Sequence, residues 1–510
     1  MFSTVLSATL RGLCVDFVQV EADVSNGLPM FHLVGYLSSE VKEAGERVRA
    51  AIRNSGIMIP PKKIIVNLSP ASMRKKGSIF DLPIAVAVLA AMEELAQNHL
   101  ANTLLVGELS LDGGVKRVAG ILPIVQEAKR KGYKRCIVPE ENKREGELVE
   151  GIEVIGVNSL REVCEVLKGN SFRKSSDRKE SISVLLKEAR YPDYSEIKGQ
   201  HLVKRAAEIA VAGNHNLMMI GPPGAGKTAI AKRIPGILPP LTKEESIDLT
   251  TIYSVMGQLD MESPLKTERP FREVHHTITS VGLIGGGTVP RPGEITLANQ
   301  GVLFLDEIAE FPKAVLETLR QPLEEHSIKI IRERGEYEFP AEFLLVAAMN
   351  PCPCGNYPDL NLCTCTTPQI QAYLGKISQP FLDRIDMCVE VPKVQYQDLT
   401  DEGNEETSET IRERIIRARE LQLERYRDYP FKTNARIGIT EIEKFCFLDD
   451  EQQEIMRRAY ECMGLTARTY HKVLGVARTI ADLDGQAAIG ARHLREALSY
   501  RMIDHKYWRR

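Results

Sequence analysis

The sequence GPPGAGKT (residues 221–228) follows the apolar run NLMMI and precedes AIAKRI, which has the spacing of an amphipathic helix. A strand, a glycine-rich turn and a helix in this order are typical of a phosphate-binding loop, because the glycines let backbone N–H groups turn inward around phosphate oxygens. Lys227 is expected to reach the β- and γ-phosphates, and the Thr228 hydroxyl to bind Mg²⁺. The sequence therefore predicts a site for ATP and Mg²⁺ formed by eight consecutive residues: Gly221, Pro222, Pro223, Gly224, Ala225, Gly226, Lys227 and Thr228.

Two later apolar strands end in residues that suit ATP hydrolysis. GVLFLDE ends in Asp306 and Glu307, and FLLVAAMN ends in Asn350. The carboxyl end of a strand in a parallel sheet faces the phosphates, so we expect Asp306 to hold Mg²⁺ through water and Glu307 to polarise the attacking water. The amide of Asn350 is suited to orient that water.

The 510 residues are enough for two or three domains. Short apolar strands alternate with helical patterns over residues 1–168, which predicts a compact α/β domain. The polar segment 169–189 has the composition of a linker. Strands and helices alternate again over residues 190–392, which predicts an α/β domain with a parallel sheet, and residues 393–510 show helical periodicity, which predicts an all-helical lid.

The composition is that of an ordinary globular protein, with 43% hydrophobic and 26% charged residues. The net charge of -3 and the pI near 6.4 argue against a surface that coats nucleic acid, so DNA binding is expected to be confined to a pore or groove. The longest strongly apolar run, Leu82 to Met92, is too short to span a membrane, and Arg11 and Asp16 interrupt the region that a signal peptide would occupy. We therefore expect a cytoplasmic protein with no membrane contact.

Four of the ten cysteines fall within 14 residues, in the two C-x-C pairs CPC and CTC. Four thiolates that close tetrahedrally around Zn²⁺ would hold a loop with little apolar content of its own. The C-x-C spacing is tighter than the usual C-x₂-C, and the alternatives are four unrelated thiols or a disulfide pair, which a reducing cytosol disfavours. We expect a structural Zn²⁺ site with these ligands: Cys352, Cys354, Cys363 and Cys365.

Two long segments around these motifs carry a family resemblance. They are RPFREVHHTITSVGLIGGGTVPRPGEITLANQGVLFLDE (269–307) and LRQPLEEHSIKIIRERGEYEFPAEFLLVAAMNPCPCG (319–355). With the phosphate-binding loop, they resemble AAA+ ATPases in general and the magnesium-chelatase-like ComM (YifB) proteins very closely, over essentially the whole chain. The resemblance implies a hexameric ring that acts on DNA as a branch-migration helicase in natural transformation and recombination.

The resemblance also implies that a neighbouring subunit completes each ATPase site. Arg384 stands where related proteins place an arginine finger, which would neutralise charge on the γ-phosphate of the next subunit. A salt bridge with Asp383 or Asp386 is the alternative. In the lid, Arg468 is similar in place to the sensor-2 arginine and Arg478 is the second candidate, while a solvated helix face is the alternative for either.

Two inserted elements are candidates to line the pore of the implied ring. Residues 267–293 interrupt the sheet as a helix-2 insert, and residues 327–339 alternate as a β-hairpin. Lys329, Arg332 and Arg334 offer charges for DNA phosphates. Three glutamates interleave with them, however, so by charge alone a solvated hairpin is equally consistent and the DNA assignment rests on the resemblance.

The first domain resembles the Lon protease domain in residues 104–142, which contain LDGGVKRVAGILP, and in the preceding stretch KKGSIFDLPIAVAVLAA. Such proteases use a serine nucleophile that a lysine activates. In the alignment these positions hold Ile79 and Leu122, although Ser78 and Lys116 lie close by and a shift of register would place them there. We expect a Lon-like fold without proteolytic activity, retained for assembly or partner contacts.

Three functions are consistent with these features. The first is an ATP-driven DNA motor of the ComM kind, the second a magnesium-chelatase-like ATPase that remodels a protein partner, and the third an ATP-dependent protease. The missing dyad weakens the third. Chelatase ATPase subunits are expected to resemble only the central and C-terminal parts of the chain, which weakens the second, so the DNA motor is the leading prediction.

Overall fold

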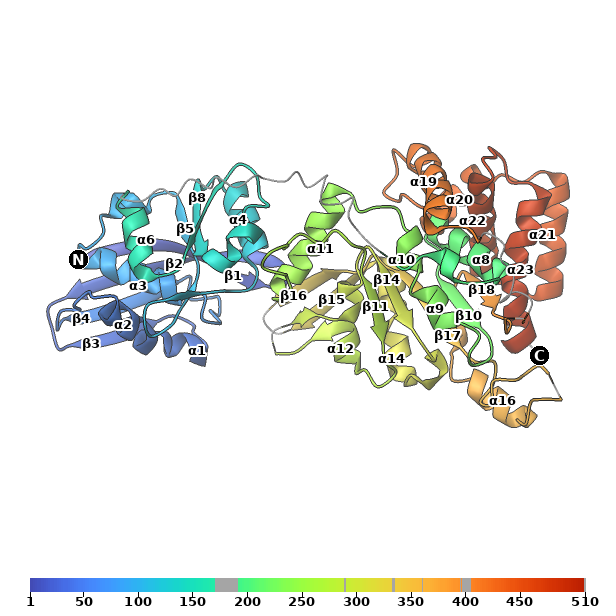
Figure 1. The fold of residues 1–510 in the computed structure, drawn as a ribbon, viewed down its shortest axis with the longest axis horizontal. Coiled ribbons are helices and arrows are strands. Elements are labelled where there is room, and N and C mark those ends of the chain that lie inside the picture. Colours follow the sequence, from blue (N-terminus) through green and yellow to red (C-terminus); the bar gives the residue numbers. More distant parts are fainter. Residues whose placement is uncertain are drawn as a thin grey trace. The chain divides into compact units, whose positions relative to one another are not determined.

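The computed structural model describes residues 1–169, 191–288, 290–332, 335–359, 361–394, 396 and 405–508. The chain divides into two compact units, of which the first contains Met1–Ile182 and Lys243–Lys266, and the second contains Ser183–Thr242 and Thr267–Arg510. The predicted α/β architecture with a helical C-terminal region is confirmed (Figure 1). Residues 170–189 of the predicted linker lie outside the described residues. None of the described helices combines the length and apolar character that a membrane span requires.

The first unit is built on a seven-stranded mixed sheet with the strand order β3-β4-β2-β1-β5-β8-β9. The strands are β1 (Phe2–Arg11), β2 (Cys14–Ser25), β3 (Met30–Val34), β4 (Lys63–Ser69), β5 (Thr103–Leu105), β8 (Arg135–Pro139) and β9 (Glu153–Val157), and a short separate pair is formed by β6 (Glu108–Leu109) and β7 (Val115–Lys116). The helices are α1 (Ser39–Lys42), α2 (Ala44–Asn54), α3 (Asp81–Ala91), α4 (Ile121–Arg130), α5 (Lys143–Gly146), α6 (Leu160–Leu167) and α11 (Lys243–Val255).

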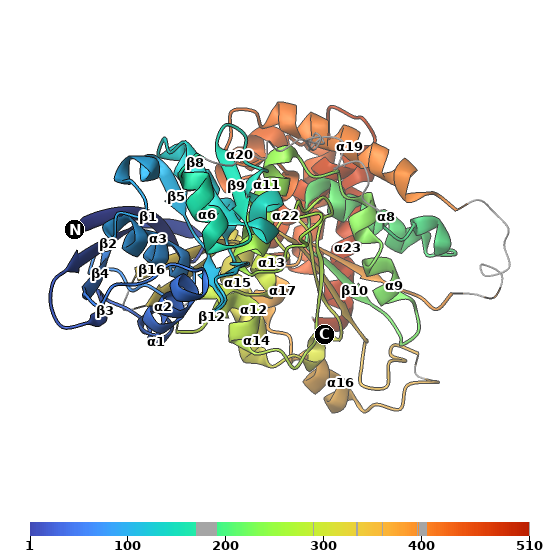
Figure 2. The same ribbon diagram turned by 60° about the vertical axis from the view of Figure 1, so that its left-hand side comes forward.

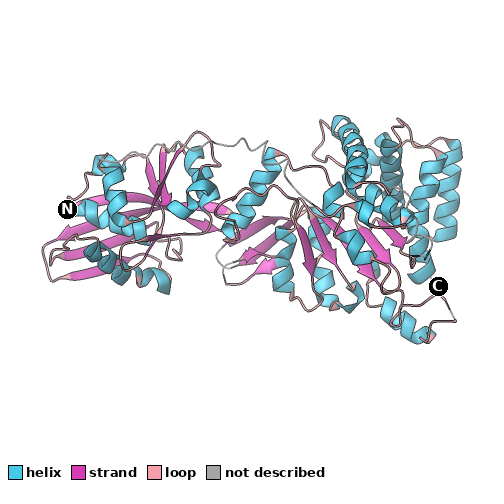
Figure 3. Ribbon diagram, viewed as in Figure 1, coloured by secondary structure: helices cyan, strands magenta, loops and turns pink. Residues whose placement is uncertain are grey.

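Helix α3 explains the longest apolar run of the chain. All of its residues are buried, and it packs against β1 and β2. Figure 3 shows it among the helices beside the magenta strands of the first unit. A helix that is apolar on every side is stable when its surroundings are also apolar, so this run forms the centre of a domain core.

The second unit contains a five-stranded parallel sheet with the order β11-β14-β17-β10-β18. Its strands are β10 (Leu217–Ile220), β11 (Phe271–Val274), β14 (Val302–Leu305), β17 (Leu344–Met349) and β18 (Met387–Glu390). Ile220 pairs with Met349, and Leu305 pairs with Ala347. The carboxyl ends of the three central strands therefore meet at one edge, where the predicted phosphate-binding and catalytic residues follow them.

Shorter elements are inserted around this sheet. Following the order of the chain, they are α8 (His201–Gly213), α9 (Lys227–Ala231), α10 (Ile234–Ile237), α12 (Ser280–Ile284), β12 (Gly285–Gly286), β13 (Arg291–Pro292), α13 (Glu294–Leu297), α14 (Lys313–Thr318), α15 (Arg320–Glu325), β15 (Ser327–Arg332), β16 (Gly335–Pro340), α16 (Thr367–Leu374) and α17 (Gln379–Leu382). Strands β15 and β16 form an antiparallel hairpin. The segment α11, which also lies within the predicted range 190–392, belongs to the first unit.

The C-terminal helices are α19 (Ser408–Arg425), α20 (Ile439–Phe445), α21 (Asp450–Met463), α22 (Ala467–Leu483) and α23 (Ala491–Trp508). They gather beside α8 and β18 in Figure 1, and Figure 2 shows α19, α20, α22 and α23 near α8 from another side. Helix α22 contacts both α8 and α23. The last turn of α23 is tied to the sheet domain, because the Trp508 indole donates a hydrogen bond to the Leu374 carbonyl at 3.1 Å. The helical region is therefore packed onto the parallel-sheet region within one unit.

Candidate active site

The loop after β10 has the backbone that phosphate binding requires. Gly224 and Gly226 adopt φ values of +76° and +89°, a left-handed region that residues with a Cβ atom rarely enter. At Gly221 an added Cβ would lie 2.2 Å from the Val391 carbonyl oxygen. These three positions require glycine for reasons of conformation and space, as the motif predicts.

Lys227 lies within this loop, with a residue exposure of only 8%. Its ammonium donates hydrogen bonds to the carbonyl oxygens of Gly221 at 2.6 Å and Pro222 at 2.9 Å, and to Asn350 Oδ1 at 3.1 Å. Burial lowers the pKa of Lys227, and the nearby carboxylates of Asp306 and Glu307 oppose that shift. The ammonium is thus held by oxygen acceptors at the place where phosphate oxygens are expected.

Asp306 and Thr228 form the oxygen pair that a magnesium ion needs. The Thr228 hydroxyl donates to Asp306 Oδ2 at 2.7 Å, and the Glu307 backbone N–H donates to Asp306 Oδ1 at 2.9 Å. Hydroxyl and carboxylate oxygens are hard ligands of the kind that Mg²⁺ prefers. Thr228 and Asp306 would therefore hold a Mg²⁺ ion that arrives with ATP, and the ion would supply charge neutralisation at the phosphates.

Glu307 is exposed and has a left-handed backbone, with φ 50° and ψ 47°. Such a conformation is uncommon for a residue other than glycine, and strained backbone is often found at functional sites. The structure therefore brings together Lys227, Thr228, Asp306 and Asn350, and it places Glu307 directly beside them in an exposed position.

Arg384, the predicted arginine finger, lies away from the nucleotide site of its own chain. The backbone N–H of Asp386 donates to the carbonyl of Asn216, which precedes β10, and Met387 pairs with Leu217. Arg384 therefore lies at the amino-terminal edge of the sheet, opposite the phosphate-binding loop. An arginine at this edge does not reach the nucleotide site of its own chain.

Arg384 and Arg468 are close to each other. Both form ion pairs with the same oxygen, Glu324 Oε1: Nη2 of Arg384 lies 2.8 Å from it, and Nη2 of Arg468 donates a hydrogen bond to it at 2.7 Å. Arg384 pairs with neither Asp383 nor Asp386, the alternative partners considered for it. Asp386 pairs with Lys472 at 2.7 Å, and the acidic partner of Arg384 is Glu324. Glu324 was not predicted, since an acidic pair in the last turn of a short helix cannot be distinguished from a solvated surface in the sequence.

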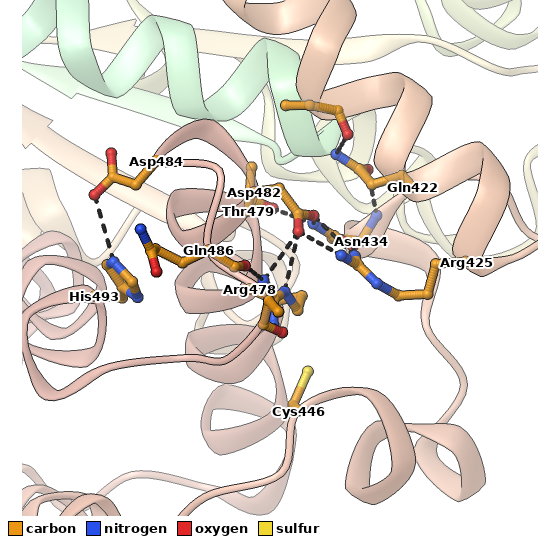
Figure 4. A network of polar contacts seen from close by, with 12 residues as sticks. Gln422, Arg425, Asn434, Cys446, Arg478, Thr479, Asp482, Asp484, Gln486 and His493 are labelled. Carbon is orange, nitrogen blue, oxygen red and sulfur yellow. Dashed lines mark hydrogen bonds and ion pairs between the residues drawn. The ribbon is translucent and has the colours of Figure 1, made fainter.

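Arg478, the second sensor-2 candidate in the lid, belongs to a network of polar contacts centred on Asp482 (Figure 4). Its side chain is 3% exposed and donates to Asp482 Oδ1 at 3.2 Å. Asp482 also accepts from Arg425 at 2.9 Å and from Asn434 at 2.8 Å. A guanidinium that is buried in this network is not available to a phosphate group, whereas Arg468 has a side chain that is 52% exposed.

The β15–β16 hairpin presents charges to solvent. Lys329 and Arg332 are exposed, and Ile331 between them is 76% exposed. Lys329 lies opposite Glu338 in the strand register. Arg334, the third predicted DNA contact, lies outside the described residues.

The four clustered cysteines converge on one point. Their sulfur atoms all lie within 4.8 Å of one another, and Cys352 is buried while the other three are half-buried. The separations from Cys352 Sγ to the sulfurs of Cys354 and Cys363 are 3.4 Å and 3.8 Å, too long for a disulfide. Four sulfurs bound tetrahedrally at the usual Zn–S distance are about 3.8 Å apart, so the donor set and spacing fit a zinc ion.

The first unit shows where the Lon-like dyad positions lie. Leu122 is buried at the start of α4, and its backbone N–H donates to Glu145 Oε1 at 2.9 Å. The Ser78 hydroxyl donates to the Glu108 carboxylate, and Lys116 is exposed on β7. Ser78 and Lys116 share no hydrogen bond among the described residues, so they do not form the alternative dyad here.

Residues Lys243–Lys266, which include α11, pack onto this part of the first unit. The Ser254 hydroxyl donates to Glu145 Oε1 at 2.5 Å, and the Ser254 carbonyl accepts from the Gly120 N–H at 3.0 Å. Arg117 Nη2 donates to the Leu259 carbonyl at 2.7 Å. Leu122 is therefore buried in a packed region that residues 243–266 help to form.

Three family models match the chain. Residues 193–399 match the model described as magnesium chelatase, subunit ChlI, and residues 405–501 match the model of the C-terminal part of that subunit. A third model, described as subunit ChlI of Mg-chelatase, matches residues 20–142. The expectation that chelatase subunits resemble only the central and C-terminal parts of the chain is wrong, because this third match lies in the first domain.

Relatives of similar length match the chain almost from end to end. The chain is 41% identical to competence protein ComM of Haemophilus influenzae over 501 residues, which cover 98% of this chain and 97% of ComM. It is 41% identical to the YifB protein of Escherichia coli K12 over 503 residues, with the same coverage. A shorter match of 134 residues, 26% of this chain and 24% of the relative, is 30% identical to Lon protease 2 of Bacillus subtilis. The chain therefore belongs to the ComM/YifB family of magnesium-chelatase-like AAA+ ATPases.

Proposed function

We propose that this ATPase works as a hexameric ring that moves on DNA and drives branch migration during recombination. The observation that carries the proposal is the separation between the nucleotide site and the arginine pair. The phosphate-binding loop follows β10 at one edge of the sheet, while Arg384 precedes β18 at the other. In this proposal a second copy of the chain supplies the arginines that complete a nucleotide site, and a closed ring gives every site such a neighbour.

In this proposal each residue of the site has one task. Lys227 binds the β- and γ-phosphates, Thr228 and Asp306 hold Mg²⁺, Glu307 polarises the attacking water and Asn350 orients it. Asn350 is suited to this task because its side chain already contacts Lys227, at 3.1 Å. The ion supplies charge neutralisation when it is bound with ATP.

The DNA part of the proposal is supported by the similarity to a competence protein and by the hairpin β15–β16. Exposed Lys329 and Arg332 are suited to phosphates, and exposed Ile331 offers an apolar contact between them. The matches to chelatase subunit models favour a second candidate, an ATPase that remodels a protein partner.

Forked or four-way DNA is expected to stimulate ATP hydrolysis, and the variant Lys329→Ala/Arg332→Ala should weaken apparent DNA affinity by about tenfold in 0.1 M salt, because two phosphate contacts are lost. The measurement is phosphate release as a function of DNA concentration, together with the salt dependence of binding. Glu338→Ala, on the facing strand, is the matched control and should not weaken binding. Indifference of the ATPase to every DNA structure would favour the remodelling function instead.

We also propose that the four clustered cysteines hold a structural Zn²⁺ beside the nucleotide site. The cluster begins two residues after Asn350, and an added Cβ at Gly355 would lie 2.4 Å from Pro223 Cδ in the phosphate-binding loop. The loop that carries the cysteines thus rests directly on the phosphate-binding loop. A zinc ion would therefore keep Asn350 and Pro223 in place.

Cys363→Ser is expected to reduce bound zinc from about one ion per chain to near zero and to lower the melting temperature by about 5 °C, because the loop loses its main constraint. Metal analysis of the purified protein and thermal unfolding measure the two effects. Cys462→Ser changes an exposed cysteine outside the cluster and should alter neither. If zinc is removed from the wild-type protein and its melting temperature stays the same as before removal, the proposed site is contradicted.

A further inference from the structure

Glu324 joins two arginines that come from distant parts of the second unit. It lies near the end of α15, whereas Arg384 follows α17 and Arg468 lies on α22 in the helical lid. Both arginines form ion pairs with the single oxygen Oε1 of Glu324, at Nη2–Oε1 distances of 2.8 Å and 2.7 Å. The two Nη2 atoms are therefore no further apart than the sum of these distances, which is close enough for both to bind one phosphate group.

The surroundings of Arg384 make Glu324 the side chain that orients it. The Arg384 side chain is only 8% exposed, and its Nη1–H group donates to the Pro380 carbonyl. Its Nε atom is buried and has no hydrogen-bond partner among the described residues. The direction of the guanidinium is thus set by one backbone carbonyl and by the Glu324 carboxylate.

Neighbouring acidic groups are engaged elsewhere. Asp386 pairs with Lys472, and Glu325 accepts a hydrogen bond from Gln321 at 2.9 Å. Glu324, by contrast, has a side chain that is 42% exposed and lies on the wall of a cavity of about 160 Å³ that Arg384, Arg468 and Lys472 also line. A phosphate group that approaches this cavity meets two guanidiniums already turned toward the same point.

We propose that Glu324 is a positioning residue that presents Arg384 and Arg468 together to one phosphate of the nucleotide held by the neighbouring subunit. This inference rests on the proposed ring function. Fixing two long side chains before the nucleotide arrives removes the entropic cost of ordering them during the reaction, and a guanidinium displaced by about 1 Å can cost about 10²-fold in rate. The shared carboxylate also links the sheet region to the lid, so that the two arginines move as one group.

The test is Glu324→Ala, measured in the full chain by steady-state ATP hydrolysis. We expect kcat to fall about tenfold or more, with KM for ATP within about twofold of wild type, because the phosphate-binding loop lies at the other edge of the sheet. Glu325→Ala is the matched control and should leave both values unchanged. The melting temperature is measured in parallel, and a fall in kcat without a fall in melting temperature supports positioning over a structural role.

A second comparison separates this inference from the function on which it rests. Glu324→Ala is introduced into two proteins, the wild type and the Arg384→Ala variant. If Glu324 acts through Arg384, the fold-loss in kcat that Glu324→Ala causes is much smaller in the Arg384→Ala variant than in the wild type. Equal fold-losses in the two backgrounds, or an unchanged kcat for Glu324→Ala while Arg384→Ala is strongly impaired, would overturn the role of Glu324 and leave the ring mechanism standing. An unchanged kcat for Arg384→Ala would instead overturn the ring mechanism itself.

Discussion

Replacing Glu307 with Gln is expected to lower kcat for ATP hydrolysis by about 10²–10⁴-fold while ATP binding stays intact. The amide cannot accept a proton from the attacking water, whereas a carboxylate can. Binding is preserved because Lys227, Thr228 and Asp306 make their contacts without the Glu307 side chain. Phosphate release measures turnover, and equilibrium titration with a fluorescent ATP analogue measures binding.

The matched control for this variant is Glu310→Gln. Glu310 is also exposed and lies three residues further along, but its carboxylate is engaged in an ion pair with Lys376 at 3.1 Å. Its turnover should stay close to that of the wild type. Hydrolysis at the wild-type rate by Glu307→Gln would show that another group activates the water and would remove Glu307 from the mechanism.

Arg384→Ala is expected to lower kcat by about 10³-fold, because the guanidinium that stabilises charge on the γ-phosphate of a neighbour is lost. Arg384→Lys should not restore the rate, since a single ammonium does not reproduce the planar, forked set of donors. Arg495→Ala removes an exposed arginine of α23 and is the matched control. Phosphate release at several protein concentrations gives the rates.

A mixing experiment tests whether this arginine acts between subunits. Arg384→Ala and Glu307→Gln protomers are each expected to be nearly inactive alone. In mixed rings, an Arg384→Ala protomer keeps its own Glu307 and receives Arg384 from a Glu307→Gln neighbour, so the mixture should hydrolyse ATP faster than either variant. Absence of recovery in rings that are shown to be mixed, or full activity of isolated chains at any dilution, would contradict action between subunits.

Much of the nucleotide site was predictable because its signals are local. The phosphate-binding loop needs glycine at particular backbone positions, and Gly224 and Gly226 adopt the left-handed conformations that the motif requires. Apolar strands that end in polar residues predicted the parallel sheet, and its register brings Asp306 and Asn350 to the same edge as Lys227. The cysteine spacing likewise predicted a cluster that the structure forms.

Other features depend on contacts between distant residues, which periodicity and motif spacing do not reveal. Glu324 and Arg468 are 144 residues apart and meet only because α22 packs near the amino-terminal edge of the sheet. The choice between Arg468 and Arg478 also needed the fold, since both lie on one helix and only burial distinguishes them. The hairpin's Arg334 is not described, so its role stays a prediction.

The sequence by itself determined the phosphate-binding loop, the acidic strand end and the cysteine cluster, because each depends on a few residues that are close together in the chain. Only the tertiary structure decided that α11 belongs to the first unit, where Ser254 bonds to Glu145, and that Arg384 shares Glu324 with Arg468. The physical reason is that local sequence specifies backbone conformation and strand ends, whereas side chains far apart in the chain meet through the packing of whole elements.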